Sequence, residues 1–306
     1  YLGFLRDSPS AAQRLCHVLS NSRFLGDALN KSVESVTWLG NDDSLQPRSR
    51  ESLDIQTKAT LERNAGNIND FANSIRAMRR HEIERIGLAW MSGVIDDEAS
   101  LAGMTDVYDA AIEASLQWAI QHRINDIQID EAPAAIAIIG MGRYGGREVN
   151  FSSDADVIII YRPAEGADDD QANLFARKVQ EDLRAILQGP TTFEPKIELD
   201  MDLRPEGKNG PLVRSYASCE EYYRSWASTW EHQALLRARY AAGDASLAED
   251  FLMNIADPLR YPKIDLTETQ IAEIRKLKAR MEAERLPRGV RRDRHLKLGK
   301  GGLSDV

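Results

Sequence analysis

The sequence predicts an α+β protein in which a small mixed sheet is flanked by helical N-terminal and C-terminal regions. Two short apolar runs, AAIAIIGM at 134–141 and ADVIIIY at 155–161, have the length and composition of buried strands. Apolar residues at helical spacing dominate before and after these runs. We therefore expect a helical region at 1–130, a sheet-containing core at 131–215 and a second helical region at 216–306.

The helical reading of the N-terminal region depends on start signals and on periodicity. Ser8-Pro9 is a helix-start pair, and a polar stretch at 40–52 predicts a loop. One apolar stripe at helical spacing consists of Val107, Ala111, Ala114 and Trp118. Such stripes are typical of packing faces. His81 and His122 have charged neighbours and no metal-ligand spacing, so we expect solvated side chains.

The core is expected to continue with a helix and a third strand. Residues 168–190 begin with three aspartates and end at Gly189-Pro190, which are helix start and stop signals. The stretch KIELDMDLRP at 196–205 alternates apolar and acidic residues. That alternation predicts a half-buried strand with Asp200 and Asp202 on its acidic face. Beyond it, 221–243 and 266–285 have helical patterns.

Composition limits the classes of function. The chain has 306 residues, 28% of them charged, with a net charge of −9, which argues against non-specific binding of nucleic acid or anionic membranes. There is no run of 18 apolar residues and no signal-peptide pattern. Cys16 and Cys219 lack metal-ligand spacing, so we expect two reduced cysteines in a cytoplasmic protein. The sequence starts at Tyr1 and ends soon after a glycine pair, and we expect a piece of a longer chain.

The stretch GMGRYG at 140–145 has the G-x-G-x-x-G spelling of a dinucleotide-binding turn. A dinucleotide fold needs a helix directly after that turn. Only seven residues separate Gly146 from Asp154, which is too short for a packed helix. The sequence therefore predicts strand, glycine turn, strand, and Gly140 and Gly142 are interpreted as incidental.

Acidic residues next to this turn favour metal-dependent phosphate chemistry. Asp154 and Asp156 are two residues apart at a strand start, so their side chains share one face. With Asp200 on a neighbouring strand, three carboxylates can hold Mg²⁺ against phosphates and water. Gly145 and Gly146 would allow close approach of a triphosphate. Asp-x-Asp alone is common on surfaces, and the specific signal is its combination with the glycines and the later acid.

Several sequence blocks then identify a family resemblance. GMGRYGGREVNFSSDADVIIIY at 140–161 resembles the nucleotidyltransferase signature of the DNA polymerase β superfamily, and in particular the glutamine synthetase adenylyltransferases. DMDLRPEGKNGPLVRS at 200–215, WEHQALLRAR at 230–239 and HLKLGKGGLSDV at 295–306 resemble further blocks of that family in order. WEHQALLRAR and EAERLPRG at 282–289 are closer to its C-terminal, adenylylating half. The resemblance implies a polymerase β-like core.

The resemblance also assigns residues. Asp154, Asp156 and Asp200 match the catalytic and metal-binding acids. Gly145 and Gly146 match the glycine turn, Ser152 and Ser153 match candidate phosphate contacts, and Arg204 would contact phosphate or brace the acids. Asp202 departs from the family pattern and leaves the third acid open, with Asp200 favoured. Glu231 and His232 could either orient the substrate or have a structural role. Lys208 and Arg214 are expected to be solvated surface charges.

The activity implied is Mg²⁺-dependent transfer of AMP from ATP to a tyrosine of glutamine synthetase, which regulates nitrogen assimilation. The tyrosine hydroxyl, with a pKa near 10, needs a base or a metal, and Asp200 can accept its proton. A PII-type signalling protein is the implied regulator, acting through regions outside this chain. Two alternatives stay open: phosphorolytic removal of AMP from the modified enzyme, and an ATP- or effector-sensing module without transferase activity.

Overall fold

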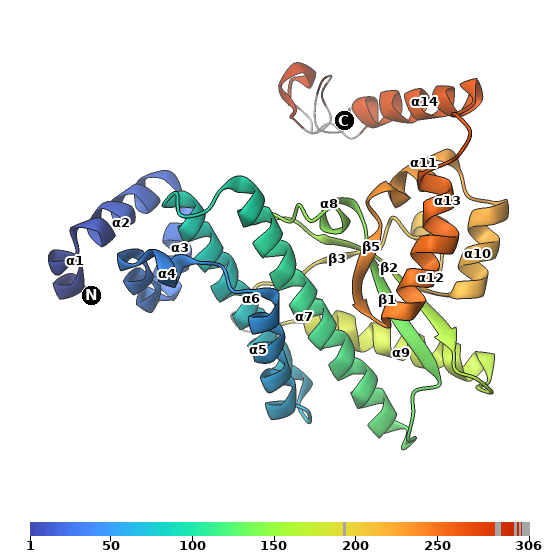
Figure 1. The fold of residues 1–306 in the computed structure, drawn as a ribbon, viewed down its shortest axis with the longest axis horizontal. Helices are drawn as coiled ribbons and strands as arrows, with labels where there is room; N and C mark the ends of the chain where they lie inside the picture. The colour runs from blue at the N-terminus through green and yellow to red at the C-terminus, as the bar shows by residue number, and fades with distance from the viewer. Residues whose placement is uncertain (192–193, 285–288, 297–298, 300, 302–306) are drawn as a thin grey trace.

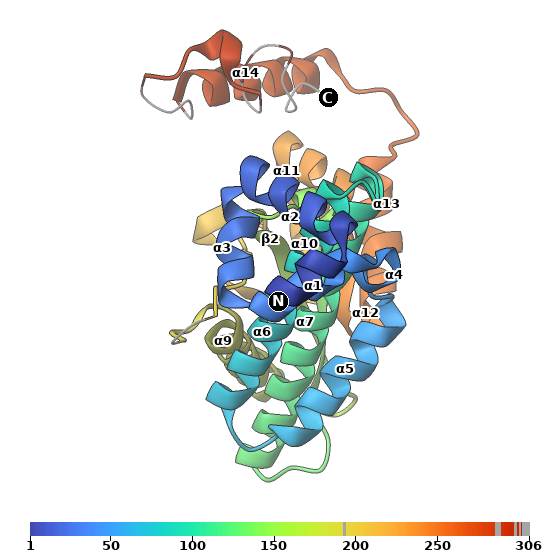
Figure 2. The ribbon, with the colours of Figure 1, turned by 90° about the vertical axis from the view of Figure 1, so that its left-hand side faces the viewer.

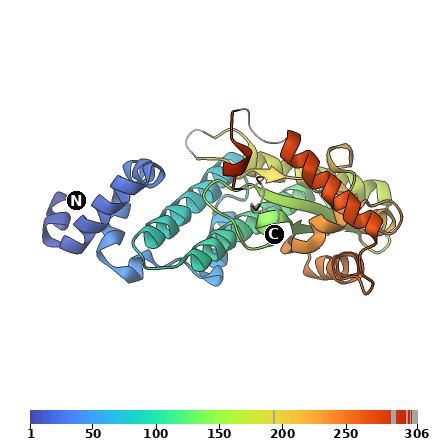
Figure 3. The same ribbon diagram turned by 90° about the horizontal axis from the view of Figure 1, so that it is seen from above.

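The computed structural model describes residues 1–191, 194–284, 289–296, 299 and 301. A helical region forms one end of an elongated molecule, and a small sheet covered by helices forms the other (Figure 1, Figure 3). The mixed α+β class expected from the sequence is confirmed. The helices of the N-terminal region are α1 (Leu2–Asp7), α2 (Pro9–Asn21), α3 (Arg23–Lys31), η1 (Val33–Gly40), α4 (Asp42–Leu45), α5 (Arg50–Arg63), α6 (Ile68–Met91) and α7 (Asp97–Asp126).

Helices α6 and α7 connect the N-terminal region to the sheet. Each begins at a side-chain cap: Asn67 accepts hydrogen bonds from two backbone N–H groups of α6, and Asp96 accepts one from Ala99. Such caps satisfy backbone donors that the first turn leaves unpaired. His122 on α7 is half exposed and stacks on Trp118, and its Nδ1 lies 2.9 Å from an Asp182 carboxylate oxygen. The His122 side chain, which the sequence predicted to be solvated, therefore makes two contacts within the protein.

The sheet combines antiparallel and parallel pairs. Its strands are β1 (Ala134–Gly140), β2 (Ala155–Pro163), β3 (Leu199–Asp200), β4 (Val213–Ser215) and β5 (Arg239–Gly243). The order is β3-β2-β1-β5. β1 pairs antiparallel with β2 and β5, whereas β3 and β4 both pair in parallel with β2. The segment 201–212 is therefore an excursion that leaves one edge of β2 and returns to it.

Helices cover both faces of the sheet. On one face, α7 and the long α9 (Asp169–Gln188) contribute to the largest core, together with Val157 and Ile159 of β2. On the other face, Ile158 and Ile160 pack with α10 (Tyr216–Ser225) and α12 (Ala245–Phe251) in a smaller core. The C-terminal elements are η2 (Gly207–Asn209), α10 (Tyr216–Ser225), α11 (Thr229–Ala234), η3 (Leu235–Arg237), α12 (Ala245–Phe251), η4 (Leu252–Ala256), α13 (Asp257–Arg260), α14 (Glu268–Glu284) and η5 (Arg292–Arg294).

Three secondary-structure predictions were wrong. The polar stretch 40–52, expected to be a loop, contains α4 and the start of α5, because Asn41 and Ser49 cap these two helices. Residues 239–243 form β5 and not the end of a helix, because the helical run stops at η3 and this segment pairs with β1. The strand expected over 196–205 is limited to Leu199–Asp200. Its pairing with β2 ends there because the chain turns away after Asp200 into the excursion.

The C-terminal helix α14 is set apart from the rest of the molecule (Figure 2). It has no buried residue, although its sequence carries an apolar stripe. Its contact with the body runs through α11, where the Thr229 hydroxyl donates to Glu273. Of the quoted sequence blocks, parts of 282–289 and 295–306 lie outside the described residues.

Candidate functional site

Two acidic side chains stand next to each other where β2 and β3 begin to pair. Asp156 is the second residue of β2 and is in parallel register with Asp200 of β3. Paired residues on neighbouring strands point to the same face, with backbones about 4.8 Å apart. Because Ile158 and Ile160 enter the smaller core, the two carboxylates lie on the sheet face that α10 and α12 cover. The sequence predicted this convergence of Asp156 and Asp200.

Asp154 lies two residues before Asp156, immediately ahead of β2, and its side chain is exposed. It lines a cavity of about 590 Å³ at the open edge of the sheet, and Asp200 and Asp202 line the same cavity. The full lining is Asp154, Arg184, Glu198, Leu199, Asp200, Met201, Asp202, Arg204, Lys208 and Leu212. The lining of this cavity therefore combines four carboxylates with the cations of Arg184, Arg204 and Lys208.

The donor set suits a hard divalent cation such as Mg²⁺, because all candidate ligands are carboxylate oxygens. Within the described part of the chain, however, no three Asp, Glu, His or Cys side chains gather closely enough to hold one ion. The backbone places Asp156 beside Asp200, and Asp154 on the neighbouring cavity wall. The metal assignment therefore stays a prediction.

The structure separates the roles of Asp200 and Asp202. An Asp200 carboxylate oxygen accepts a hydrogen bond of 2.7 Å from the Asp202 backbone N–H, which fixes the start of the excursion. The Asp202 carboxylate faces the Lys208 ammonium at 3.1 Å. Only Asp200 is in register with Asp156. This geometry favours Asp200 as the third acid and gives Asp202 a cation partner within the excursion.

Arg204 holds the excursion together from inside. It is 7% exposed, and its guanidinium donates to the carbonyls of Met201, Lys208 and Gly210 at 2.8, 3.0 and 2.9 Å. The carbonyls of Lys208 and Gly210 gain a partner in this way, and the Met201 carbonyl, which also accepts from the Arg204 backbone N–H at 3.1 Å, gains a second one. Of the two roles that the sequence left open, this arrangement favours bracing of the acidic segment over contact with phosphate.

Gly142 has a closer relation to the acids than its sequence context indicated. Its φ is +53°, a left-handed conformation that favours glycine. A Cβ at this position would stand 2.3 Å from a carboxylate oxygen of Asp156. Interpreting Gly142 as incidental was therefore wrong: the glycine turn packs directly against an acid of the candidate site. The sequence did contain an indication of this contact, because only a few residues separate the glycine turn from Asp154 and Asp156.

Gly145 and Gly146 lie in close contact with neighbouring parts of the protein. A Cβ on Gly145 would stand 2.1 Å from the carbonyl oxygen of Arg237 and 2.5 Å from that of Gly140. A Cβ on Gly146 would come to 3.2 Å from the Arg237 side chain. Gly145 is therefore required by backbone packing, independently of any triphosphate. The predicted phosphate contact of these glycines is not tested by this geometry.

The two serines before Asp154 differ in their availability. The Ser153 hydroxyl donates to the Asn150 side-chain oxygen at 3.0 Å and accepts from the Asn150 backbone N–H at 3.0 Å. The Ser152 side chain is exposed, and only its backbone N–H is engaged with Asn150. Of the two predicted phosphate contacts, Ser152 is the one with a hydroxyl that is open to solvent.

Glu231 has a structural role. It is 3% exposed, and its carboxylate accepts hydrogen bonds from the Tyr222 hydroxyl, from Ser228 and from the Glu206 backbone N–H. Burial and the neighbouring Glu231 raise the pKa of Tyr222 to about 12. Because Glu206 belongs to the excursion, Glu231 ties α11 to the segment that starts at Asp200. Burial lowers the pKa of His232.

A buried ion pair next to the glycine turn was missed in the sequence. Arg239 of β5 donates to both Asp109 carboxylate oxygens, at 2.8 and 3.0 Å, and to the Tyr144 carbonyl at 3.2 Å. Asp109 is 2% exposed, and Tyr144 lies within the glycine turn. No short sequence motif could predict this ion pair, because 130 residues separate Asp109 from Arg239.

A glycine turn joining two antiparallel strands, followed by acids on adjacent strands of a small mixed sheet, defines a nucleotidyltransferase-like core. Comparison with known proteins agrees with this class. A model of the glutamate-ammonia ligase adenylyltransferase family matches residues 12–254, and the chain belongs to this family.

Two similar relatives have the same description. A bifunctional glutamine synthetase adenylyltransferase/adenylyl-removing enzyme of Bifidobacterium longum (strain DJO10A) is 78% identical over all 306 residues, which cover 28% of that protein. A protein of Mycobacterium avium (strain 104) with the same name is 42% identical over 311 positions, covering 31% of its length. The chain thus spans less than a third of these relatives. Among the described residues, no helix is long and apolar enough to cross a membrane.

Proposed function

We propose that this chain is a catalytic unit that transfers AMP from ATP to a tyrosine hydroxyl of glutamine synthetase, releasing pyrophosphate. The observation that carries the proposal is the register pairing of Asp156 with Asp200, with Asp154 close by and the glycine turn packed against Asp156. Membership of the adenylyltransferase family supports the choice of substrate.

The residues divide the work by position. ATP would lie with its triphosphate along the glycine turn and the exposed Ser152 hydroxyl. Asp154, Asp156 and Asp200 would hold Mg²⁺, which when bound neutralises phosphate charge and lowers the pKa of a nearby hydroxyl. Asp200 accepts the proton of the attacking tyrosine. Because Asp202 supplies its backbone N–H to Asp200, the excursion fixes the orientation of this base.

Catalysis of this kind depends chiefly on positioning. The tyrosine oxygen attacks the α-phosphorus, a new P–O bond forms, and the bond to the pyrophosphate oxygen breaks on the opposite side. The chain contributes by holding the phosphates still and by excluding alternative orientations. The excursion 201–212, tied down by Arg204 and Glu231, forms one wall of this arrangement.

The first test replaces two of the acids. In Asp154→Asn/Asp156→Asn, transfer of labelled AMP from ATP to unmodified glutamine synthetase should fall by about a thousandfold or more, since both charges that would hold the cation are lost. The matched control is Asp130→Asn/Asp169→Asn, which removes two exposed acids outside the cavity. Thermal melts should show both variants folded. Near-normal transfer by the Asp154/Asp156 variant would refute the proposed site.

The reverse reaction is a second candidate, because the relatives' name includes an adenylyl-removing activity. The same acids would then serve attack by inorganic phosphate on the AMP–tyrosine bond, with ADP as product. Incubating the chain separately with unmodified enzyme plus labelled ATP, and with modified enzyme plus phosphate, distinguishes the directions. We expect labelled protein in the first reaction and no ADP in the second.

We extend the proposal to a cytoplasmic setting and to regulation by a PII-type signalling protein. Support for this part comes from the resemblance of the sequence blocks to the family. If a PII-type protein acts through regions outside this chain, adding it to the transfer assay should leave the rate of the isolated chain unchanged.

A further inference from the structure

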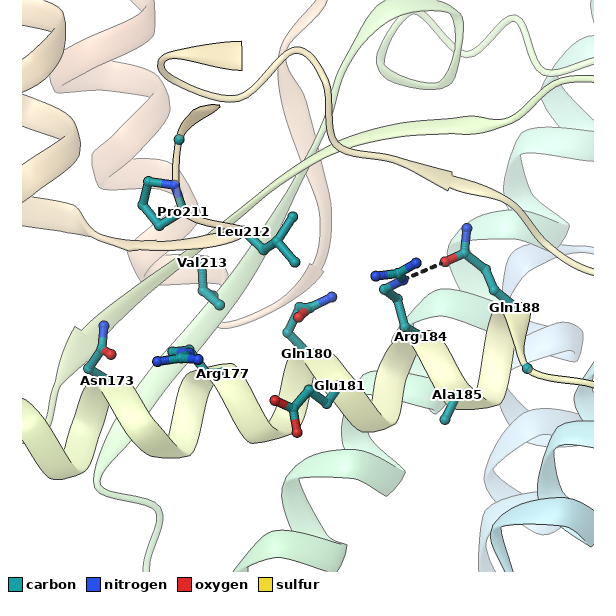
Figure 4. A pocket seen from close by; sticks show the side chains of 12 residues that line it. Asn173, Arg177, Gln180, Glu181, Arg184, Ala185, Gln188, Pro211, Leu212 and Val213 are labelled. Atoms are coloured by element: carbon teal, nitrogen blue, oxygen red, sulfur yellow. Dashed lines mark hydrogen bonds between the residues drawn. The ribbon is translucent and has the colours of Figure 1, made fainter. Parts of the chain in front are cut away.

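A second cavity, of about 820 Å³, lies between α9 and the end of the excursion (Figure 4). Helix α9 packs on the sheet face opposite to the one that carries Asp156 and Asp200. Residues 210–213 form the facing wall. The cavity adjoins the candidate site only through Arg184 and Leu212, which line both. Its volume is in the range of small-molecule pockets.

One side of α9 presents hydrogen-bond donors to this cavity. Arg177, Gln180 and Arg184 follow one another at helical spacing, and all three line it. Figure 4 shows Gln180 between the two arginines, with its amide directed toward Leu212. The structure gives Arg177 no ion pair or hydrogen bond within its described part, and Arg184 uses only its Nε, toward Gln188 at 3.1 Å. Most of their guanidinium donors are therefore available.

The Gln180 amide is the strongest sign of a missing ligand. Its side chain is 4% exposed, and its buried Nε2 has no hydrogen-bond partner in the described structure. A buried donor without a partner costs about 1–3 kcal/mol, so such groups are normally satisfied. The amide oxygen, and not Nε2, is the more accessible atom of this side chain, so a half-turn of the amide would bring the donor to a ligand oxygen in the cavity.

The charges select the ligand class. Two guanidinium groups face the cavity against one carboxylate, Glu181, which is already paired with Lys178 at 2.8 Å. Arg177 and Arg184 are seven residues apart, about 10 Å along the helix axis. One compact anion would engage a single guanidinium, whereas a molecule with an oxyanion at each end would engage both.

We propose that this cavity binds a small organic dianion, with one oxyanion on Arg177, the other on Arg184, and an oxygen between them accepting from Gln180 Nε2. Carboxylate and phosphate both match the planar guanidinium donors. The apolar wall at Pro211, Leu212 and Val213 would cover the carbon chain of the ligand.

Equilibrium binding to the full chain tests this site, with malate and 3-phosphoglycerate as probes, because each carries a hydroxyl between its two oxyanions, and with acetate as the single-charge comparison. Both probes should bind about tenfold more tightly than acetate, although the phosphate of 3-phosphoglycerate adds more than one charge near pH 7, and the tighter probe identifies the second oxyanion as carboxylate or phosphate. Arg177→Gln should weaken dianion binding by about tenfold, the loss expected for one charge-assisted contact. Gln180→Leu should weaken it similarly.

The controls separate this site from the proposed active site. Arg224→Gln removes an exposed arginine of α10 that lines neither cavity, and it should bind the probes like the unchanged chain. Asp154→Asn/Asp156→Asn should also bind them normally, so failure of the catalytic proposal would leave this result intact. Arg177 is exposed, so its variant should keep the wild-type melting temperature.

Two results would overturn the proposal. One is the absence of saturable binding of either dianion at millimolar concentration. The other is binding that is equal for acetate and the dianions and indifferent to Arg177→Gln, which would indicate non-specific ion association.

Discussion

Gly142 is the residue at which backbone conformation and the candidate site meet. Its φ of +53° disfavours any side chain, and the Asp156 carboxylate occupies the space that a Cβ would need. Gly142→Ala should therefore displace Asp156 and lower AMP transfer by about tenfold or more. We expect a loss of unfolding free energy of about 1–2 kcal/mol from the backbone alone, measured by urea denaturation beside the transfer assay.

Gly166 offers a matched control for that substitution. Its φ is +77°, and a Cβ there would meet no atom within 4 Å. Gly166→Ala should lose a similar amount of stability, because the backbone cost is the same, and keep its transfer rate. Equal loss of transfer in both variants would show that destabilisation, and not displacement of Asp156, is the cause.

Glu84 makes stability depend on pH. It lies on α6, 1% exposed, and its carboxylate oxygens make no hydrogen bond of good geometry, although the hydroxyls of Ser32 and Ser35 lie nearby. Burial raises its pKa to about 7, although the Ser35 hydroxyl and the charge of Arg80 oppose this. Arg80 is itself paired with Glu194 at 2.8 Å, so its charge is shared.

The sign follows from the raised pKa. The folded state holds a proton that the unfolded chain releases near pH 4.5, so stability is complete below that pH and is lost as pH rises through about 7. Glu84→Gln should be more stable than the unchanged chain at pH 8, by up to about 3 kcal/mol, and equal at pH 4. Glu62→Gln, at an exposed position, should show no such difference in urea melts.

At the scale of elements, the Asp109–Arg239 pair joins α7, the glycine turn and β5. Asp109→Leu leaves Arg239, 21% exposed, with backbone carbonyls as its remaining acceptors and also removes a 3.5 Å partner of Arg50, so it should cost about 3 kcal/mol of unfolding free energy. Replacing both partners, as in Asp109→Leu/Arg239→Met, should recover most of that loss. A double-mutant cycle in urea measures the coupling. Additive losses would mean that the pair does not hold these elements together.

Local patterns were sufficient to predict β1, β2, α9 and the placing of Asp154 and Asp156. Apolar runs, helix signals and the two-residue spacing of acids all act within a few residues. β5 could not be predicted in this way, because its pairing with β1 depends on residues about 100 positions away. Arg204 was recognised by motif, but its three carbonyl partners depend on the path of the excursion. Both features depend on contacts between residues that a local sequence pattern does not connect.

At the scale of the whole molecule, periodicity predicts helices but not which of them the fold depends on. Both α9 and α14 carry apolar stripes in the sequence. α9 buries its stripe in the largest core, with Leu183 and Ile186 at 0% exposed, whereas α14 has no buried residue. The N-terminal helices build a further core of their own against α6. The free energy of folding is therefore concentrated around the sheet and α6–α7.

This contrast gives a matched pair of substitutions. Leu183→Ala removes methyl groups from a fully buried site and should cost about 2–5 kcal/mol. Leu277→Ala on α14 makes the same chemical change at a partly exposed site and should stay within about 0.5 kcal/mol, because alanine is an equally good helix former. Urea denaturation of both variants measures the difference. If Leu277→Ala lowered the unfolding free energy as much as Leu183→Ala, α14 would have to pack against the body in solution. Only a buried leucine side chain contributes that much to the unfolding free energy.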